Sequence, residues 1–396
     1  MASPKIEVRP NAASESPALA AEASAAALAR VALPGWTARQ LTALLAQRGH
    51  AWLLTGPSGL GQYSLALEMA RAWLCSEPTG QGACGLCGSC HAIDVRTHAD
   101  LCVLMPETVM MALGWPLSEK AQSDIDDKKR KASKEIRIEA MRDAVEFTQR
   151  TSARGRGKAV LIFPAERMNN VTANALLKTL EEPPGDIKFV LASEAAHQLL
   201  PTIRSRCLGH NMVWPSMQES LQWLQTQGIA DDRAASPPTL QTLQTLQTLL
   251  MAAGGRPLDA LLYAQSGRDL KSWAALPGAM QRGDVSLVRD WTPMQTIDAL
   301  HKLCHDLLAV KTGALPRFFE AGDLPKTAVA SPFADLTQWA RAMTLATRTM
   351  EHPFNPGLML EALVNQACQA MNAGLGNGVH ASRGAGVKLQ TAPAKP

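Results

Sequence analysis

The fold of this 396-residue chain is decided by the stretch Gly56-Pro57-Ser58-Gly59-Leu60-Gly61-Gln62-Tyr63. A short apolar run, Ala51 to Leu54, precedes it, and a segment with helical spacing, Ser64 to Leu74, follows it. A strand, a glycine-rich turn and a helix in this order are the context in which a phosphate-binding loop is credible. The stretch therefore predicts an α/β domain built around this turn.

The last two positions of the loop lack the groups that bind a nucleotide. A working loop ends in Lys, whose charge reaches the outer phosphates, followed by Ser or Thr, whose hydroxyl holds Mg²⁺. Here these positions are Gln62, which is neutral, and Tyr63, whose hydroxyl lies too far from the backbone to replace that of serine. With Gly56, Gly59 and Gly61 in place, the sequence predicts a degenerate cradle that does not bind ATP productively.

Composition excludes several classes of protein. A formal net charge of +4 is small for this length, so charge alone does not indicate a nucleic-acid binder. No apolar run approaches the roughly 18 to 20 residues of a membrane span. The Ala- and Ser-rich residues 1–33 lack the pattern of an export signal, and we expect a disordered leader there. A cytoplasmic protein without a membrane partner is predicted.

Short apolar runs alternate with helix-like segments over residues 34–212, which is typical of a parallel sheet covered by helices on both faces. From Trp214 onward the strand signals disappear. We therefore expect one α/β domain followed by two helical domains, residues 213–275 and 276–373. Residues 374–396 are rich in Gly, Ala and Pro and are expected to be a disordered tail.

Two segments of biased composition carry no predicted chemistry. The Thr-Leu-Gln repeat of residues 239–250 places a leucine at every third position, which suits one face of a helix. The polar stretch 110–134 ends in a mixed-charge run, residues 124–131. Such a run suits either contact with a phosphate backbone or a solvated loop insertion. We expect the solvated loop.

Four of the eight cysteines lie within 16 residues of a Gly-rich segment: Cys75, Cys84, Cys87 and Cys90. In a reducing compartment, cysteines serve as metal ligands or free thiols more often than as disulfides. Four thiolates surround one Zn²⁺ in a tetrahedral structural site, which leaves no open position for catalysis. The spacing predicts a structural zinc module over residues 75–90.

Other interpretations of the cysteines stay open. Cys87-Gly88-Ser89-Cys90-His91 matches the attachment signature of c-type haem, but that chemistry belongs to exported proteins. A ferredoxin-like iron–sulfur site starts with similar spacing, yet its fourth Cys-Pro is missing here. Free thiols without a metal are the third alternative. His91 and His98 are candidate substitute ligands, although surface positions suit them better.

Two further motifs lie downstream of the cysteines. Residues 174–184 read Asn-Ala-Leu-Leu-Lys-Thr-Leu-Glu-Glu-Pro-Pro, and residues 205–207 read Ser-Arg-Cys. Together with the loop and the cysteine set, they make the chain resemble the delta-prime family of bacterial DNA polymerase III clamp-loader subunits, in the AAA+ superfamily. The resemblance covers about residues 34 to 372. Weaker matches are Ser193, at the sensor-1 position, and Asn355-Pro356.

The chain departs from the active members of that superfamily at two more places. Where they have Asp-Glu after a strand, to hold Mg²⁺ and activate water, this sequence has Pro164 and Ala165, and Glu166 comes one position late. Where they keep a sensor-2 arginine, Leu258 aligns, and Arg256 is two residues away. These losses favour the non-hydrolysing delta-prime subunits over their ATPase relatives.

The resemblance implies a RecA-like AAA+ domain with the zinc module, a small helical lid domain and a helical collar domain that serves oligomerisation. It implies the gamma/tau and delta subunits as partners, and the sliding clamp and primed DNA through the complex. No intrinsic catalysis is expected. The chain would be a component of the DNA polymerase III holoenzyme, and polymerase activity would belong to the complex.

The Ser205-Arg206-Cys207 motif is the one catalytic contribution that the resemblance implies. Arg206 would be an arginine finger, a guanidinium that meets the γ-phosphate of a nucleotide bound by the neighbouring gamma/tau subunit. A local salt bridge at a helix end is the simpler interpretation of the arginine alone. Arginine fingers of GTPases contribute roughly 10³- to 10⁵-fold in rate.

Two other functions are carried as alternatives. One is an ATP-hydrolysing clamp-loader subunit of the gamma/tau type, or another AAA+ remodeller, that tolerates an altered loop. The other is a zinc-ribbon DNA-binding protein, which would need basic residues around the cysteines. There is no Lys or Arg between Cys75 and Cys90, so the second alternative is weak.

Overall fold

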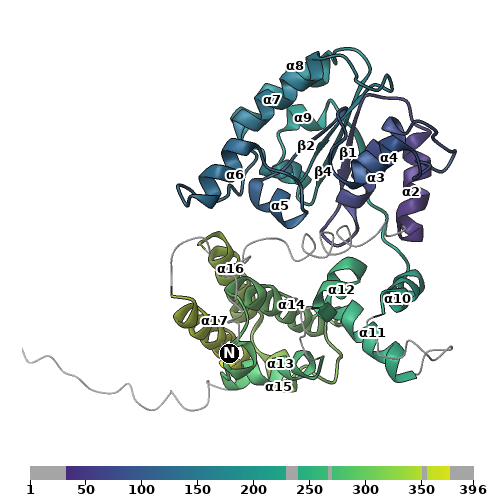
Figure 1. The fold of residues 1–396 in the computed structure, drawn as a ribbon. Coiled ribbons are helices and arrows are strands. Elements are labelled where there is room, and N and C mark those ends of the chain that lie inside the picture. Colours follow the sequence, from purple (N-terminus) through teal and green to yellow (C-terminus); the bar gives the residue numbers. More distant parts are fainter. Residues whose placement is uncertain (1–32, 229–239, 266–269, 350–354, 375–396) are drawn as a thin grey trace, which may run out of the picture. The chain divides into compact units, whose positions relative to one another are not determined.

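The structure is a computed structural model that describes residues 33–228, 240–265, 270–349 and 355–374 (Figure 1). The chain forms two compact units, Met1–Gly267 and Arg268–Pro396. The expected leader up to residue 32 and the tail from residue 375 lie outside the described residues, as does Thr239 of the Thr-Leu-Gln repeat. Among the described helices, none is long and apolar enough to cross a membrane.

A sheet of five parallel strands forms the centre of the first unit, in the order β2-β3-β4-β1-β5. The strands are β1 (Ala51–Thr55), β2 (Leu101–Leu104), β3 (Lys158–Ile162), β4 (Ile187–Ser193) and β5 (Leu208–Asn211). Nearly every residue of β1, β3 and β4 is buried, as expected for strands covered on both faces. The predicted parallel α/β sheet is confirmed.

Helices cover both faces of this sheet, and side chains alternate between the two cores (Figure 1). One face packs against α2 (Gly35–Leu45), α3 (Gln62–Leu74) and α5 (Glu107–Ala112). The other face packs against α7 (Ile138–Gln149), α8 (Asn170–Glu181) and α9 (Pro201–Arg204). Within β1, Trp52 and Leu54 belong to the first core, while Ala51 and Leu53 belong to the second, because successive strand residues point to opposite faces.

The remaining elements of the first unit are short or helical. Around the sheet these are α4 (Gly88–Asp94), α6 (Glu119–Asp126) and the 3₁₀ turns η1 (Ala165–Arg167) and η2 (Ala196–Gln198). After the sheet come α10 (Met217–Thr226), α11 (Leu240–Ala252) and α12 (Pro257–Gln265). The described part of the Thr-Leu-Gln repeat forms α11 and buries Leu246 and Leu249, so the predicted helix face is confirmed.

The second unit is entirely helical over its described residues. Its elements are α13 (Leu270–Arg282), η3 (Ser286–Val288), α14 (Pro293–Lys311), α15 (Lys326–Ala330), α16 (Phe333–Thr349) and α17 (Pro356–Asn372). The core of this unit includes Leu300, Leu303 and Cys304 of α14. The domain boundary expected at 275/276 falls inside α13, and the whole helix belongs to the second unit.

The polar stretch 110–134 differs from the solvated loop expected for it. It contains α6, and the charged run starts inside that helix. Arg130 of the run donates to the carboxylate of Glu107 from Nη1 at 2.5 Å and from Nη2 at 2.8 Å. The Ser133 N–H donates to the same carboxylate at 2.8 Å. Opposite charges at a distance of 23 residues therefore organise the segment, which composition alone did not indicate.

Substitution of Glu107 tests this salt bridge through its pH dependence. Burial acts to raise the pKa of the Glu107 carboxyl, but hydrogen bonds from Arg130 and the Ser133 amide outweigh it and lower the pKa. A lowered pKa stabilises the fold above the unfolded-state pKa of about 4.3, and this stabilisation is lost as the pH falls through the folded-state pKa. We expect Glu107→Gln to reduce the free energy of unfolding by about 1–3 kcal/mol at pH 7.

Urea denaturation of the wild type and the variant at several pH values measures this difference. It should shrink steadily below about pH 4.3. The control is Asp127→Asn, which removes an exposed carboxylate of the same segment and should change the stability by less than about 0.5 kcal/mol. A difference between Glu107→Gln and wild type that is the same at every pH would contradict the assigned role of the carboxylate.

Candidate functional site

The glycine loop joins the end of β1 to the start of α3, which begins at Gln62. Gly59 and Gly61 have φ angles of 79° and 90°, in the left-handed region that favours glycine. The N–H of Gly56 donates to the carbonyl of Ser193, at the end of the neighbouring strand β4, at 3.3 Å. The backbone of a phosphate-binding loop is therefore present where the sequence placed it.

The side chain of Gln62 is used inside the loop itself. It is 1 % exposed, and its Nε2 donates to the carbonyl oxygens of Gly56 and Pro57, each at 2.7 Å. A primary amide carries two N–H groups, so both donors of Nε2 are engaged. The residue at the lysine position thus closes the loop on its own backbone and offers neither a charge nor a free donor to a phosphate.

Tyr63 points into the core of the sheet. Its ring is 1 % exposed and stacks on Phe163, with ring centroids 5.5 Å apart and an angle of 27° between the planes. The indole Nε1 of Trp115 donates to the Tyr63 hydroxyl oxygen at 2.7 Å. The residue that occupies the magnesium-ligand position therefore has its hydroxyl in a buried hydrogen bond, away from the loop backbone.

The ends of β3 and β4 carry little of the chemistry of an active site. Pro164 follows β3 through a cis peptide bond, and Ala165 is fully buried, so neither supplies a carboxylate. Glu166 turns toward β4, where its Oε1 accepts from the N–H of Glu194 at 3.1 Å. Ser193 pairs with Thr55 in the sheet, and its Oγ accepts from the N–H of Ala195 at 3.2 Å. Ser193 thus lies beside the loop but serves the turn after β4.

The start of α12 closes over the loop, a contact that sequence spacing did not reveal. Arg256 donates from Nη1 to Ser58 Oγ at 2.9 Å and pairs through Nη2 with Asp259 at 2.9 Å. Ser58 Oγ lies 3.3 Å from the Asp259 carboxylate, and the N–H of Leu258 donates to the Gly59 carbonyl at 3.3 Å. We call Ser58, Arg256 and Asp259 the loop clasp. Its only cation is neutralised by Asp259.

Arg206 lies just after α9 and before the edge strand β5. Its Nε donates to Glu181 Oε1 at 2.6 Å, its Nη2 donates to the same oxygen, and its Nη1 donates to the Thr202 carbonyl at 3.0 Å. The side chains of this pair are 32 % and 46 % exposed. Within the single chain, Arg206 therefore forms a local salt bridge, which is the simpler interpretation of this arginine.

The two residues that flank Arg206 differ in exposure. Ser205 is exposed and donates from Oγ to the Thr202 carbonyl at 3.1 Å. Cys207 is half-buried, and burial raises the pKa of its thiol to about 12. Cys207 is therefore a neutral thiol at pH 7 and no nucleophile.

The four cysteines of the predicted zinc module converge on one point. Cys75 ends α3, and Cys87 caps the start of α4. The Sγ atom of Cys75 lies 3.5 Å from that of Cys84, 3.8 Å from that of Cys87 and 3.7 Å from that of Cys90. Tetrahedral zinc with Zn–S bonds of about 2.3 Å requires sulfurs about 3.8 Å apart. The cluster therefore fits a four-thiolate metal site.

Backbone amides support negative charge in this cluster. The N–H groups of Cys84 and Gly85 donate to Cys75 Sγ at 3.3 Å and to Cys90 Sγ at 3.2 Å. Burial acts to raise the pKa of Cys87, but N–H groups of Cys90 and Ser76 outweigh it and lower the pKa to about 5. His91 is exposed, as expected. His98 is buried, so the surface position expected for it is wrong; its Nδ1 accepts from the Asp100 N–H at 3.1 Å. With four cysteines converging, neither histidine is needed as a substitute ligand.

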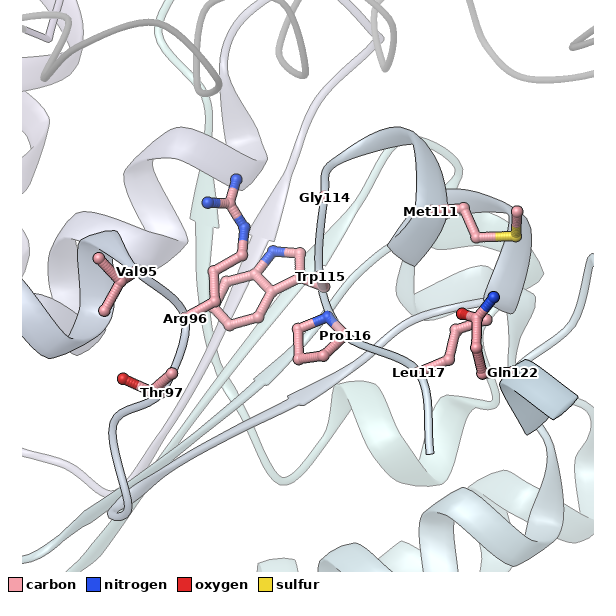
Figure 2. Close-up of a pocket in the computed structure, with 9 residues that line it drawn as sticks. All are labelled: Val95, Arg96, Thr97, Met111, Gly114, Trp115, Pro116, Leu117 and Gln122. Carbon is pink, nitrogen blue, oxygen red and sulfur yellow. The ribbon is translucent and has the colours of Figure 1, made fainter. Parts of the chain in front are cut away.

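A groove of about 490 Å³ lies between the segment that follows α4 and residues 111–122. Figure 2 shows Val95, Arg96 and Thr97 on one side of it and Met111 and Gln122 on the other, with Trp115 between them. Arg96 is the one ionic group among the nine residues that line the groove. Its guanidinium lies over the Trp115 ring and donates to the Leu113 carbonyl at 2.6 Å. The groove thus lacks a set of catalytic groups.

The chain is similar to known subunits of DNA polymerase III. The family model described as "DNA polymerase III, delta subunit" matches residues 39–213. The DNA polymerase III subunit delta' of Pseudomonas aeruginosa is 38 % identical over 228 residues, which are 57 % of this chain and 60 % of that protein. The subunit delta' of Escherichia coli is 32 % identical over 265 residues, or 65 % of this chain and 72 % of that protein.

The DNA polymerase III subunit tau of Escherichia coli is also similar, at 31 % identity over 212 residues. That match covers 54 % of this chain but only 28 % of the tau subunit. The delta' proteins are thus matched over a much larger share of their own length. The chain belongs to the DNA polymerase III delta' family.

Proposed function

We propose that this chain is a clamp-loader subunit that hydrolyses no ATP itself and donates Arg206 to the nucleotide of a neighbouring gamma/tau subunit. The observation that carries the proposal is the loop of the chain itself. Both donors of the Gln62 amide are bound to the carbonyls of Gly56 and Pro57, at the position where an active loop presents its lysine. Tyr63 and the pair Pro164–Ala165 support the same conclusion, because they provide neither ligand nor base.

The loop clasp also favours a subunit without productive nucleotide binding. Arg256 is the cation nearest in sequence to the sensor-2 position, yet its charge is paired with a largely buried Asp259. A side chain at Gly59 would come within 2.7 Å of that carboxylate. A negatively charged phosphate group placed against this loop would approach the Asp259 carboxylate and would be repelled by it.

The surroundings of Arg206 are compatible with a finger delivered to another subunit. Its salt bridge with Glu181 is partly exposed, and exposed pairs contribute about 0.2–1 kcal/mol. An arginine finger lowers the barrier by about 4–7 kcal/mol, from roughly 10³- to 10⁵-fold in rate. Release of Arg206 from Glu181 would therefore cost little beside the transition-state stabilisation that a finger supplies, and the guanidinium can present two N–H groups to a γ-phosphate.

In the proposed assembly the chain takes its place in a cytoplasmic ring with gamma/tau subunits on one side and the delta subunit on the other. Helices α10 to α12 form the lid domain, and the helices of the second unit form the collar that holds the subunits together. The assembly uses ATP to open the sliding clamp and place it on primed DNA. Polymerase activity belongs to the holoenzyme.

The similarity to the tau subunit favours one alternative, a subunit that binds and hydrolyses ATP on its own. That function would need a cation at position 62 and a Mg²⁺ ligand at position 63. The internal bonds of Gln62 and Tyr63 weigh against it, since both side chains would have to leave buried partners.

We propose Zn²⁺ as the metal of the four-cysteine site. Cys75, Cys84, Cys87 and Cys90 would occupy all four positions of a tetrahedral ion, so the metal would stabilise the fold without an open site for a substrate. The ion would join the end of α3 to the start of α4. The thiolate-only donor set and the sulfur spacing support zinc over harder cations, which prefer oxygen ligands.

The arginine finger is tested by Arg206→Ala in a reconstituted clamp loader. Assembly should survive, because the side chain is partly exposed and its salt bridge is weak. ATPase stimulated by primed DNA should fall steeply, because the nucleotide site that Arg206 serves loses roughly 10³- to 10⁵-fold in rate. Arg204→Ala, two residues away and exposed, is the matched control and should leave the ATPase rate near wild type. An unchanged rate in Arg206→Ala would remove the finger assignment.

The metal is tested by elemental analysis of the purified chain. We expect about one equivalent of zinc per chain, and its loss in Cys84→Ser/Cys87→Ser because two of four ligands disappear. The matched control is Cys207→Ser/Cys368→Ser, which removes two thiols outside the cluster and should retain the metal. Iron together with the visible absorbance of an iron–sulfur cluster would disprove a zinc site at these cysteines, and so would full metal content in Cys84→Ser/Cys87→Ser.

A further inference from the structure

A basic loop connects α7 to β3 over residues 150–157. It reads Arg-Thr-Ser-Ala-Arg-Gly-Arg-Gly, and no acidic residue occurs from residue 147 to residue 165. Arg154 and Arg156 are exposed, and the side chain of Arg150 is 68 % exposed. The overall charge of the chain gave no sign of this concentration of guanidinium groups.

The loop is held in one conformation by a buried carboxylate. Asp100 is 1 % exposed and accepts from the N–H groups of Ala153 at 2.6 Å and Arg154 at 2.8 Å. It also accepts from Ser152 Oγ at 3.1 Å. Beyond it, Gly157 has a φ of 76°, and a side chain there would come within 2.6 Å of the Asp186 carbonyl. The arginines are therefore presented by a fixed backbone.

The same loop lies against the metal module. Arg154 Nη1 donates at 3.3 Å to Ser89 Oγ, which lies between the ligands Cys87 and Cys90. Arg154 is 65 residues away from Ser89 in sequence, so the absence of basic residues between the first and last cysteines is offset by a distant segment. The loop and the module form one surface, which we call the basic surface: Arg150, Arg154 and Arg156 with the edge of α4.

The charges of this surface are largely available. Among the described residues, Arg150 pairs with Glu146 alone, and both side chains are more than two-thirds exposed, so the pair is weak. Arg154 uses one nitrogen for Ser89, and Arg156 has no partner among the described contacts. Lys158 does not contribute, because its Nζ donates to the Phe147 carbonyl and lies over that ring at 4.5 Å.

We propose that the basic surface binds the phosphate backbone of a nucleic acid. Guanidinium groups meet phosphate oxygens with two parallel hydrogen bonds, and a rigid loop loses little entropy when it does so. The loop offers no aromatic or large apolar anchor of the kind that dominates protein interfaces, which favours phosphate over an acidic protein. The arginines lie on a surface loop and not on a helix or strand that would enter a groove, so we expect contacts to phosphates, which carry no sequence information.

This contact goes beyond the proposed function, in which DNA is reached only through the complex. It is also independent of Arg206 and of ATP. It is therefore measured on the isolated full-length chain with its metal, by fluorescence anisotropy of a labelled 30-base-pair duplex over a series of salt concentrations. A failure of this binding leaves the ATPase test of Arg206 untouched.

The principal variant is Arg150→Glu/Arg156→Glu, and the matched control is Lys120→Glu/Lys131→Glu. Both change the charge by the same amount, and the control lysines are exposed residues of the first unit. The slope of log K against log salt should fall by about 2 in the loop variant, because each phosphate contact contributes about 0.9. Affinity at 100 mM salt should fall at least about tenfold in that variant and change less than about threefold in the control.

Arg156→Gln is a second variant that breaks no described contact, so its effect cannot be attributed to misfolding. It should lower the slope of log K against log salt by about 1. Three results would overturn the proposal: no binding of the duplex by the wild type, an equal loss in the loop variant and the control, or no loss in the loop variant. A labelled polyglutamate of matched charge that binds as tightly as the duplex would also overturn it, in favour of an acidic protein partner.

Discussion

The interior position of β1 in the sheet, between β4 and the edge strand β5, places the glycine loop and the segments around it. It is hydrogen-bonded to β4 on one side and to β5 on the other, and its register places Thr55 beside Ser193. Parallel strands end at the same edge of a sheet, so the segments after β1, β3 and β4 converge there. The glycine loop, Pro164 and Ser193 meet at this edge for that reason, although more than 130 residues separate the first from the last.

At this edge, groups that would serve a nucleotide are replaced by bonds within the chain. The Gln62 amide binds loop carbonyls, the Tyr63 hydroxyl accepts from Trp115, and Arg256 binds Ser58 and Asp259. Each bond gives a buried polar group a partner, which it needs because an unsatisfied one costs about 1–3 kcal/mol. The loop is therefore retained as the turn between β1 and α3, where glycines at positive φ are required. In the proposed function, the contribution to nucleotide chemistry that remains is that of Arg206 to a neighbouring subunit.

The sequence was sufficient for features that depend on neighbouring residues. The buried strands β1, β3 and β4 are continuous apolar runs, and the four cysteines are close in sequence. Strand β5 (Leu208-Gly209-His210-Asn211) was not predicted, because it lies at the sheet edge and three of its four residues are exposed. Features that depend on distant pairs were not predicted either: the Arg130–Glu107 salt bridge, the loop clasp and the contact of Arg154 with Ser89. Spacing contains no information on such pairs, because tertiary packing alone brings them together.

The central claim is that the loop of this chain has lost its nucleotide while Arg206 serves that of a neighbour. Its most direct test is equilibrium binding of ATP to the isolated chain by calorimetry, with and without Mg²⁺. We expect no saturable binding at micromolar ATP and no dependence on Mg²⁺, because the lysine, the magnesium ligand and the acidic pair are all absent. Micromolar binding that requires Mg²⁺ and is followed by turnover would contradict the account and favour an ATPase subunit.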